Sequence, residues 1–187
     1  MKAILLLILS SIILLYIPLN RQTPKYRLNI GFDHRIPLLP WTVWIYFSYY
    51  LLLPLSIILT WNSRFATSLL VTQIVATAIA TILWKIFPNG VIRPQVEVGN
   101  RLNERLLRLI YSHDKDCNGL PSGHVLHSFV SCFYLAKLYP QMWVVFFLLL
   151  FAISFSTLTT KQHYFVDMIG TLALAPFIIE LSSIIHL

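Results

Sequence analysis

Charged residues are scarce in this chain: Asp, Glu, Lys and Arg make up 11% of its 187 residues, and hydrophobic residues make up 57%. So little charge excludes an ordinary soluble domain, in which about 25% of the residues are charged. The two cysteines, Cys117 and Cys132, are too few to form a disulfide framework. The sequence also lacks internal repeats and the alternating pattern of an outer-membrane barrel. These absences leave a helical membrane protein as the expected class.

Long apolar runs are what the chain has instead. Each is long enough to cross roughly 30 Å of hydrocarbon, and in lipid the backbone must satisfy its own hydrogen bonds, so the runs are expected to be helices. No small-residue cleavage site follows the first run, so we expect it to be retained. We predict an all-α fold, a single transmembrane domain over residues 1–187 with six transmembrane helices. The predicted spans are 3–19, 41–60, 67–87, 122–139, 142–159 and 163–183.

Two loops, residues 20–40 and 88–121, hold most of the charge. Six alternating spans place both loops on one membrane face, together with the short connection at 160–162. We therefore expect the active site at that face. Polar and ionisable side chains next to hydrocarbon are costly, and by default they mark a functional site.

A histidine and a carboxylate follow that short connection. His163 and Asp167 lie four residues apart, so on a helix they would share one face. A carboxylate bonded to one ring nitrogen fixes the tautomer and leaves the other nitrogen nucleophilic. This pair predicts a histidine nucleophile.

A second group of polar residues opens the span at 122–139. Free backbone N–H groups at Ser122 and Gly123, just after Pro121, would form an anion site at a helix start. His124 stands where it could protonate a leaving oxygen. Upstream, the guanidinium of Arg93 offers two donors that match phosphate oxygens. Together these residues predict a phosphoryl-transfer site.

These residues form three ordered motifs that resemble the type 2 phosphatidic acid phosphatase superfamily. The motifs are Arg93-Pro94, Pro121-Ser122-Gly123-His124, and Ser156 followed by His163 and Asp167. The stretch 156–167, and the spacing of Asp114, Asn118, Pro121 and Ser122, are similar to the branch that includes inositol phosphorylceramide synthases.

The resemblance implies a membrane lipid-phosphate phosphatase that hydrolyses a phosphomonoester or diphosphate. His163 would attack phosphorus, Asp167 would orient it, His124 would protonate the leaving group, and water would then hydrolyse the phosphohistidine. It implies neither a metal nor a cofactor, and its partners would be the membrane and a lipid phosphate, not nucleic acid. The sequence does not identify the lipid or the oligomeric state.

The chain departs from the resemblance at two basic positions. Lys85 stands one residue further from Arg93 than the family's lysine does, which turns a helical side chain by about 100°. The family's arginine after the serine of the third motif is replaced by Thr157. If the helix continues, Lys161 shares a face with Thr157 and could supply the missing cation. We therefore include Lys161 and Lys85 among the expected phosphate-binding residues.

Other functions remain open on the residues alone. A phosphotransferase would pass the phosphoryl group to an alcohol, and an intramembrane serine protease would use Ser122 with His163 as base. A metal-dependent hydrolase could use the histidines and Asp167, but the site lacks a carboxylate cluster and its cations would repel a metal. A lipid-binding or transport protein would not need a nucleophile with an orienting carboxylate.

Two observations give opposite predictions for the side of the membrane that the active site faces. Basic residues gather on the active-site face, which by the positive-inside rule would be cytoplasmic. Bacterial members of the similar family act mostly outside the cytoplasm. We expect a bacterial inner membrane protein whose active site faces the periplasm. Residues 101–112, with arginines on one face and leucines largely opposite, are expected to form an amphipathic helix on the bilayer surface.

Overall fold

The computed structural model describes residues 1–96 and 101–185. Within these residues all regular secondary structure is helical, apart from two isolated β-bridges, and the predicted all-α class is confirmed. The α-helices are α1 (Lys2–Ile13), α2 (Tyr16–Asn20), α3 (Val43–Thr60), α4 (Ala66–Ile86), α5 (Leu102–His113), α6 (Gly123–Leu138), α7 (Trp143–Thr159) and α8 (Phe165–Ile185). Short 3-10 turns, η1 (Pro40–Thr42) and η2 (Pro140–Met142), precede α3 and α7.

Five segments of the described chain are long and apolar enough to cross a membrane, which indicates an integral membrane protein. They correspond to five of the predicted runs, and the first combines α1 with α2. Their mean hydropathies lie between 1.7 and 2.4. The segments are Lys2–Asn20, Pro40–Thr60, Ala66–Ile86, Pro140–Thr159 and Phe165–Ile185.

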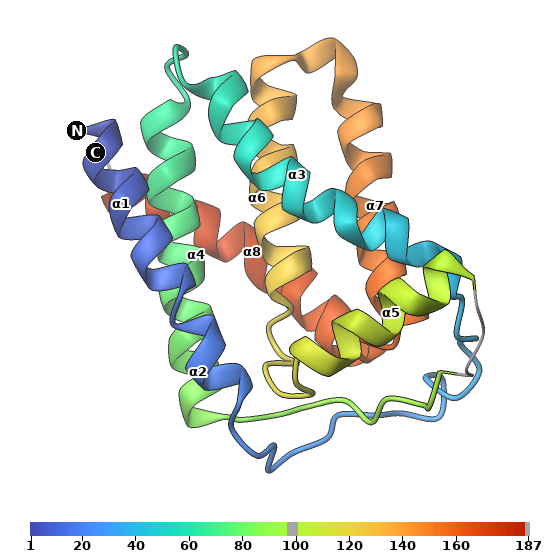
Figure 1. The fold of residues 1–187 in the computed structure, drawn as a ribbon. Helices are drawn as coiled ribbons and strands as arrows, with labels where there is room; N and C mark the ends of the chain where they lie inside the picture. The colour runs from blue at the N-terminus through green and yellow to red at the C-terminus, as the bar shows by residue number, and fades with distance from the viewer. Residues whose placement is uncertain (97–100, 186–187) are drawn as a thin grey trace.

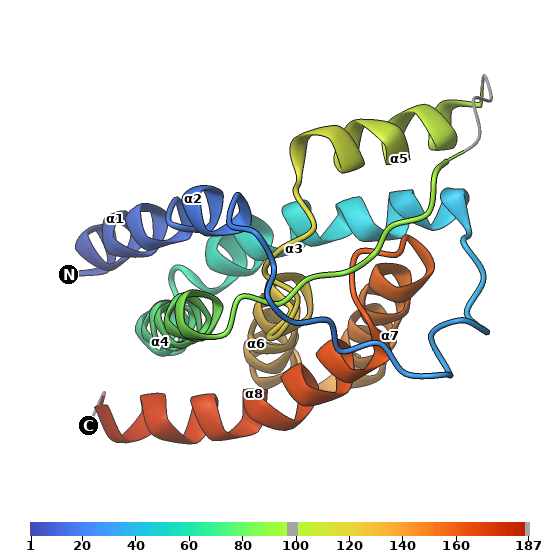
Figure 2. The ribbon, with the colours of Figure 1, turned by 90° about the horizontal axis from the view of Figure 1, so that it is seen from below.

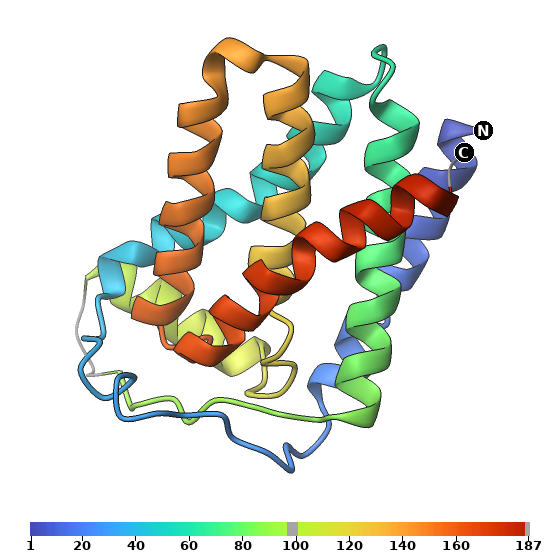
Figure 3. The ribbon, with the colours of Figure 1, turned by 180° about the vertical axis from the view of Figure 1, so that it is seen from behind.

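The predicted count of six spans is not confirmed, because the run at 122–139 forms the shorter helix α6 of 16 residues. Sixteen residues extend only about 24 Å. This helix packs against α3, α4, α7 and α8 and runs through the centre of the bundle (Figures 1 and 3). Because neighbouring helices surround α6, its histidines and serines are largely shielded from lipid.

The helices form three layers when the bundle is seen from its lower end (Figure 2). A row of α4, α6 and α7 lies in the middle, with α1, α2 and α3 on one side and α8 on the other. The starts of α3, α6 and α8 and the ends of α2, α4 and α7 all lie toward this lower end. The predicted convergence of helix ends is therefore observed.

The two charged loops cross each other at that end. The amide of Lys25 donates to the carbonyl of Pro88 at 2.8 Å, and that of Gly90 donates to Tyr26 at 3.0 Å. The second loop is not wholly irregular, because it contains α5, the expected amphipathic helix. Leu107 and Ile110 of α5 are buried, while Leu102 and Leu109 are exposed. Residues 97–100 of this loop lie outside the described residues.

A segment of the first loop, residues 29–39, fastens the turn between α7 and α8. The carboxylate of Asp33 accepts hydrogen bonds from the amides of Ile30 at 2.7 Å and Phe165 at 2.8 Å. The ammonium of Lys161 donates to the carbonyls of Asp33 at 3.1 Å and Ile36 at 2.6 Å. Because Phe165 is the first residue of α8, Asp33 satisfies one of the free N–H groups at that helix start.

Replacing Asp33 by alanine should lower the free energy of unfolding by about 1–3 kcal/mol, because the amide of Phe165 would lose its charged acceptor. Unfolding in detergent, followed by circular dichroism, measures the change. Asp116→Ala is the matched control: its pair with Arg27 is partly exposed, and losing it should cost less than about 1 kcal/mol. Equal losses for the two variants would contradict the role assigned to Asp33.

Candidate active site

His163 lies in the turn between α7 and α8. Helix α7 ends at Thr159, and Lys161 adopts φ 53°, in the left-handed region. The amides of Gln162 and His163 then both donate to the carbonyl of Thr157, at 2.9 and 3.1 Å. These bonds fix the position of the His163 backbone, and its side chain is buried.

Asp167 contacts His163, but not for the reason that the sequence predicted. Since α8 begins at Phe165, His163 precedes the helix, and the predicted shared helical face is wrong. The Asp167 carboxylate instead caps the helix start: its Oδ2 accepts from the amide of Tyr164 at 2.9 Å and lies 3.8 Å from His163 Nδ1. This arrangement leaves Nε2 as the ring nitrogen that points away from the carboxylate.

The start of α6 carries the second group of predicted residues. Ser122 is the N-cap of the helix, and its hydroxyl accepts from the amide of Val125 at 3.4 Å. Its own amide donates to the hydroxyl of Thr171 on α8 at 2.7 Å. Gly123 opens the helix, and the ring of His124 lies with its centroid 6.0 Å from that of His163. The two predicted histidines therefore come together.

Aromatic side chains of α3 surround His124. The rings of Tyr46 and Tyr49 lie 4.4 and 4.6 Å from its ring, centroid to centroid. The hydroxyl of Tyr50 lies 3.4 Å from Nε2 of His124. These three tyrosines were not predicted from the sequence, although their spacing of three and four residues along one helix face indicates a common neighbour.

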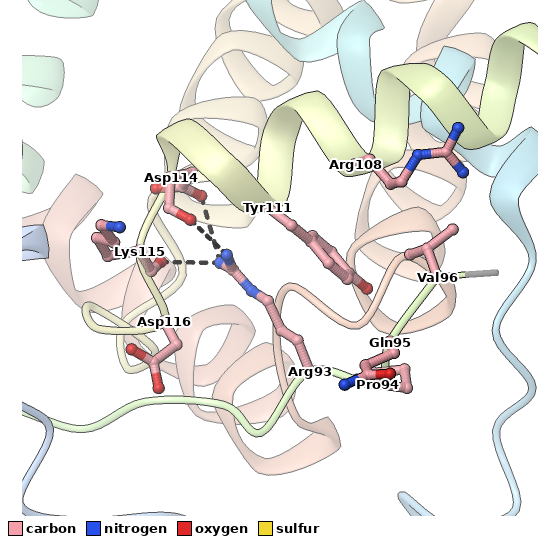
Figure 4. A pocket seen from close by; sticks show the side chains of 9 residues that line it. All are labelled: Arg93, Pro94, Gln95, Val96, Arg108, Tyr111, Asp114, Lys115 and Asp116. Carbon is pink, nitrogen blue, oxygen red and sulfur yellow. Dashed lines mark hydrogen bonds and ion pairs between the residues drawn. The ribbon is translucent and has the colours of Figure 1, made fainter. Parts of the chain in front are cut away.

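Arg93 reaches the turn that carries His163. Its Nη2 donates to Oε1 of Gln162 at 2.6 Å and to the carbonyl of Lys115 at 2.9 Å, and Nη1 donates to the carbonyl of Asp114. Nη2 also pairs with the Asp114 carboxylate at 3.5 Å (Figure 4). Arg93 thus joins the loop before α6 to the turn before α8.

Asp114 is a site residue that the charge pattern did not single out. The hydroxyl of Tyr16 donates to its Oδ1 at 2.6 Å. Burial raises the pKa of Asp114, while the positive charge of Arg93 and the hydrogen bond from Tyr16 act in the opposite direction. The guanidinium of Arg93 lies 5.1 Å from the ring centre of Tyr111, so it contacts an aromatic ring as well as oxygens. Figure 4 draws both side chains.

The structure does not support the expected helical relation between Lys161 and Thr157. The helix ends before Lys161, so the two residues do not share a face, and Thr157 is fully buried with its hydroxyl donating to Ser154. Lys161 instead lines a cavity with His163. Desolvation lowers the pKa of Lys161, and the charge of Asp33 partly offsets this. Lys85 is exposed in the last turn of α4.

The chain passes close to Asp167 at Asn118 and Gly119, and this explains the residue types at both positions. A side-chain carbon added to Gly119 would lie 2.4 Å from Asn89 Oδ1 and 3.1 Å from Asp167 Oδ2, so only glycine fits without displacement. Asn89 accepts from the amide of Leu120 at 2.6 Å. Asn118, which directly precedes Gly119, has φ 65°, in the left-handed region. The Asn-Gly sequence was the available signal for this sharp local path.

Two cavities reach the histidines from different sides. One of about 420 Å³ is lined by His163 and Lys161 together with residues of the 29–38 segment. The other, of about 180 Å³, is lined by His124, Gly123 and mainly apolar or aromatic side chains of α1, α2, α3 and α4. A third cavity, of about 470 Å³, contains Arg93 (Figure 4). The cavity beside His163 thus contains more charged and polar side chains than the largely apolar cavity beside His124.

Among residues 1–96 and 101–185, no group of three or more His, Cys, Asp or Glu side chains is placed to hold a metal ion. His127, one turn beyond His124, is bonded through Nδ1 to Gln73 Oε1 at 2.6 Å. That contact ties α6 to α4 within the core of the bundle.

Comparison with known proteins identifies the family of this chain. No curated protein and no solved structure gives a significant match to the chain. The PAP2 superfamily model matches residues 65–186, more than half of the chain, and this segment includes every predicted site residue from Lys85 to Asp167. The chain therefore belongs to the PAP2 superfamily.

Proposed function

We propose that this protein is a membrane lipid-phosphate phosphatase that works through a phosphohistidine at His163. The arrangement that carries the proposal is His163 beside the Asp167 carboxylate, with the His124 ring 6.0 Å away. Arg93 is bonded to the same turn through Gln162. PAP2 superfamily enzymes are phosphatases, typically independent of metals, and the five candidate spans suit a substrate dissolved in the bilayer.

The proposed chemistry uses the two ring nitrogens of His163 differently. With Nδ1 toward Asp167, Nε2 forms a bond to phosphorus while the bond from phosphorus to the lipid oxygen breaks. That oxygen takes a proton from His124. A water molecule then returns a proton to His124 as its oxygen bonds to phosphorus, and the bond to His163 breaks to release inorganic phosphate.

The phosphate cradle consists of groups from three segments. Arg93 supplies a fixed positive charge, and the amide of Gly123 lies at the positive end of α6, while the Ser122 amide is taken by the hydroxyl of Thr171. Lys161 lines a cavity with His163 and adds positive charge there, while its ammonium itself donates to the carbonyls of Asp33 and Ile36. Lys85, exposed at the end of α4, would have to bend toward the site to take part.

The apolar cavity beside His124 suits the lipid part of the substrate. Its lining includes Leu14 and Ile17, which are 62% and 48% exposed on the outside of the bundle. A lipid chain could therefore enter sideways between α1, α3 and α4, with its phosphate between the two histidines. His124 would then stand on the leaving-group side, opposite the attacking His163.

A phosphotransferase remains the alternative, and Asp114 favours it. Asp114 belongs to the stretch that resembles inositol phosphorylceramide synthases, and it contacts Arg93 at the site. The two functions differ only in whether water or an alcohol takes the phosphoryl group from His163. Phosphate release from a panel of lipid phosphates, with and without an added alcohol, distinguishes them.

The contacts of Ser122 argue against the serine protease. Its side chain is fully buried, and its hydroxyl caps α6 by accepting from Val125. A serine nucleophile needs its oxygen bonded to a general base and open to a substrate. The N-cap geometry gives Ser122 a structural position at the start of α6 instead.

His163→Ala should abolish phosphate release from lipid phosphates while the protein still elutes as a folded species in detergent. Asp167→Asn, which keeps the size of the side chain, should lower kcat by about 10²–10⁴-fold through loss of orientation. Radiolabelled substrate and rapid quenching in base would trap the phosphohistidine in the wild type only. Normal turnover by His163→Ala would refute the mechanism.

His124→Ala should lower kcat most for lipid substrates, because an alkoxide is a poor leaving group and needs a proton. An activated aryl phosphate needs less proton assistance, so the fold-decrease in kcat on that substrate should be at least about tenfold smaller. Parallel measurements of kcat on both substrates test this. Equal losses would mean that His124 binds the phosphate without donating a proton.

We propose that the active site faces the periplasm of a bacterial inner membrane. His113 is exposed on α5, on the active-site side of the bundle, so a cysteine there reports the sidedness of the site. Since Cys117 and Cys132 are buried, His113→Cys in intact cells should react with a membrane-impermeant maleimide far faster than the wild type. Labelling only after lysis would place the site in the cytoplasm.

A further inference from the structure

Gln162 is the side chain that connects the cation of the site to the proposed nucleophile. It directly precedes His163, is 4% exposed, and accepts from Arg93 Nη2 through its Oε1 at 2.6 Å. That contact fixes the orientation of the amide, because only the oxygen can accept. The amide nitrogen, Nε2, is consequently the free end of the side chain.

Two buried donors at this contact have no partner within the described residues. They are Nε2 of Gln162 and Nε of Arg93, and both are shielded from solvent. Buried donors are nearly always paired, so an unpaired one calls for an acceptor. Two such donors on side chains that are bonded to each other, next to His163, fit the oxygens of a bound phosphate.

Lys161 and Thr157, the two residues that the sequence comparison placed near the family's missing cation, are already engaged. The Lys161 ammonium donates to the carbonyls of Asp33 and Ile36. The hydroxyl of Thr157 donates to Ser154 and the residue is fully buried. These contacts turn both side chains toward other parts of the protein and leave the Gln162 amide as the polar group nearest in sequence to the nucleophile.

We propose that Gln162 binds the phosphate directly, with Nε2 donating to a non-bridging oxygen while Oε1 holds Arg93 in place. The inference rests on the proposed function and adds a phosphate-binding residue to that site. Glutamine suits both tasks because its amide has one accepting end and one donating end. A donor fixed before the reaction stabilises the charge that develops on the transferred group.

Gln162→Glu separates the two tasks of the side chain. Glutamate has the same length and keeps an acceptor for Arg93, with a stronger charge-assisted bond, but it cannot donate when ionised. Gln162→Met keeps the size and removes both polar ends. If Gln162 binds phosphate, both variants should lose about 10–10³-fold in kcat/KM. Their inhibition constants for inorganic phosphate should rise at least about tenfold.

The opposite outcome is equally clear. A Gln162→Glu enzyme within about twofold of the wild type in kcat/KM and in phosphate inhibition would overturn the proposal, because a residue that only holds Arg93 tolerates the carboxylate. Gln141→Glu, an exposed glutamine in η2 at the other end of the bundle, is the matched control and should change neither value. If Gln162→Glu does not fold, an unchanged inhibition constant for phosphate in Gln162→Met overturns the proposal, because that variant lacks the donating amide.

Failure of the proposed function would look different. If the wild type hydrolyses no lipid phosphate, the direct affinity for inorganic phosphate, measured by titration calorimetry in detergent, still tests Gln162. Weaker phosphate binding by Gln162→Glu than by wild type supports the phosphate contact even then, and equal binding overturns it. If a phosphohistidine can be trapped in the wild type and Gln162→Glu has the same kinetics as the wild type, the proposed function stands and only the proposal for Gln162 is overturned.

Discussion

The carbonyl of Thr157, which accepts the amides of both Gln162 and His163, is the contact on which the site depends. It closes α7 into a turn, reverses the chain, and sets His163 just ahead of α8. Asp33 fastens the other side of this turn by accepting from Phe165. The nucleophile proposed at His163 is thus held on both sides by hydrogen bonds to the backbone of its turn, and its side chain is buried.

Two helix starts lie close to this turn and add to its electrostatics. The amino end of α6 carries Ser122 and Gly123, and the amino end of α8 is capped by Asp167. The carboxylate of Asp167 that accepts from the amide of Tyr164 at the start of α8 also lies 3.8 Å from Nδ1 of His163. The same capping interaction that starts α8 therefore also places a carboxylate beside the histidine, as the proposed mechanism requires.

The cations of the site are held by oxygens of the protein itself. Arg93 is bonded to carbonyls, to Asp114 and to Gln162, and Lys161 is bonded to two carbonyls of the 29–39 segment. Such fixed donors need little reorganisation when charge develops on a phosphate. One cavity is lined by His163 and Lys161, and a second, more apolar cavity is lined by His124.

The sequence alone determined the helical class, five of the spans, the family and the residues that gather at one end of the bundle, because hydropathy and motif order depend on composition and spacing. It could not determine that α7 stops at Thr159, since a left-handed Lys161 and a cap from Asp33 arise only when distant segments meet. For the same reason, two predictions were wrong: that His163 shares a helical face with Asp167, and that Lys161 shares one with Thr157. Spacing fixes neighbours only inside a continuous helix, and here tertiary hydrogen bonds replaced the helix with a turn.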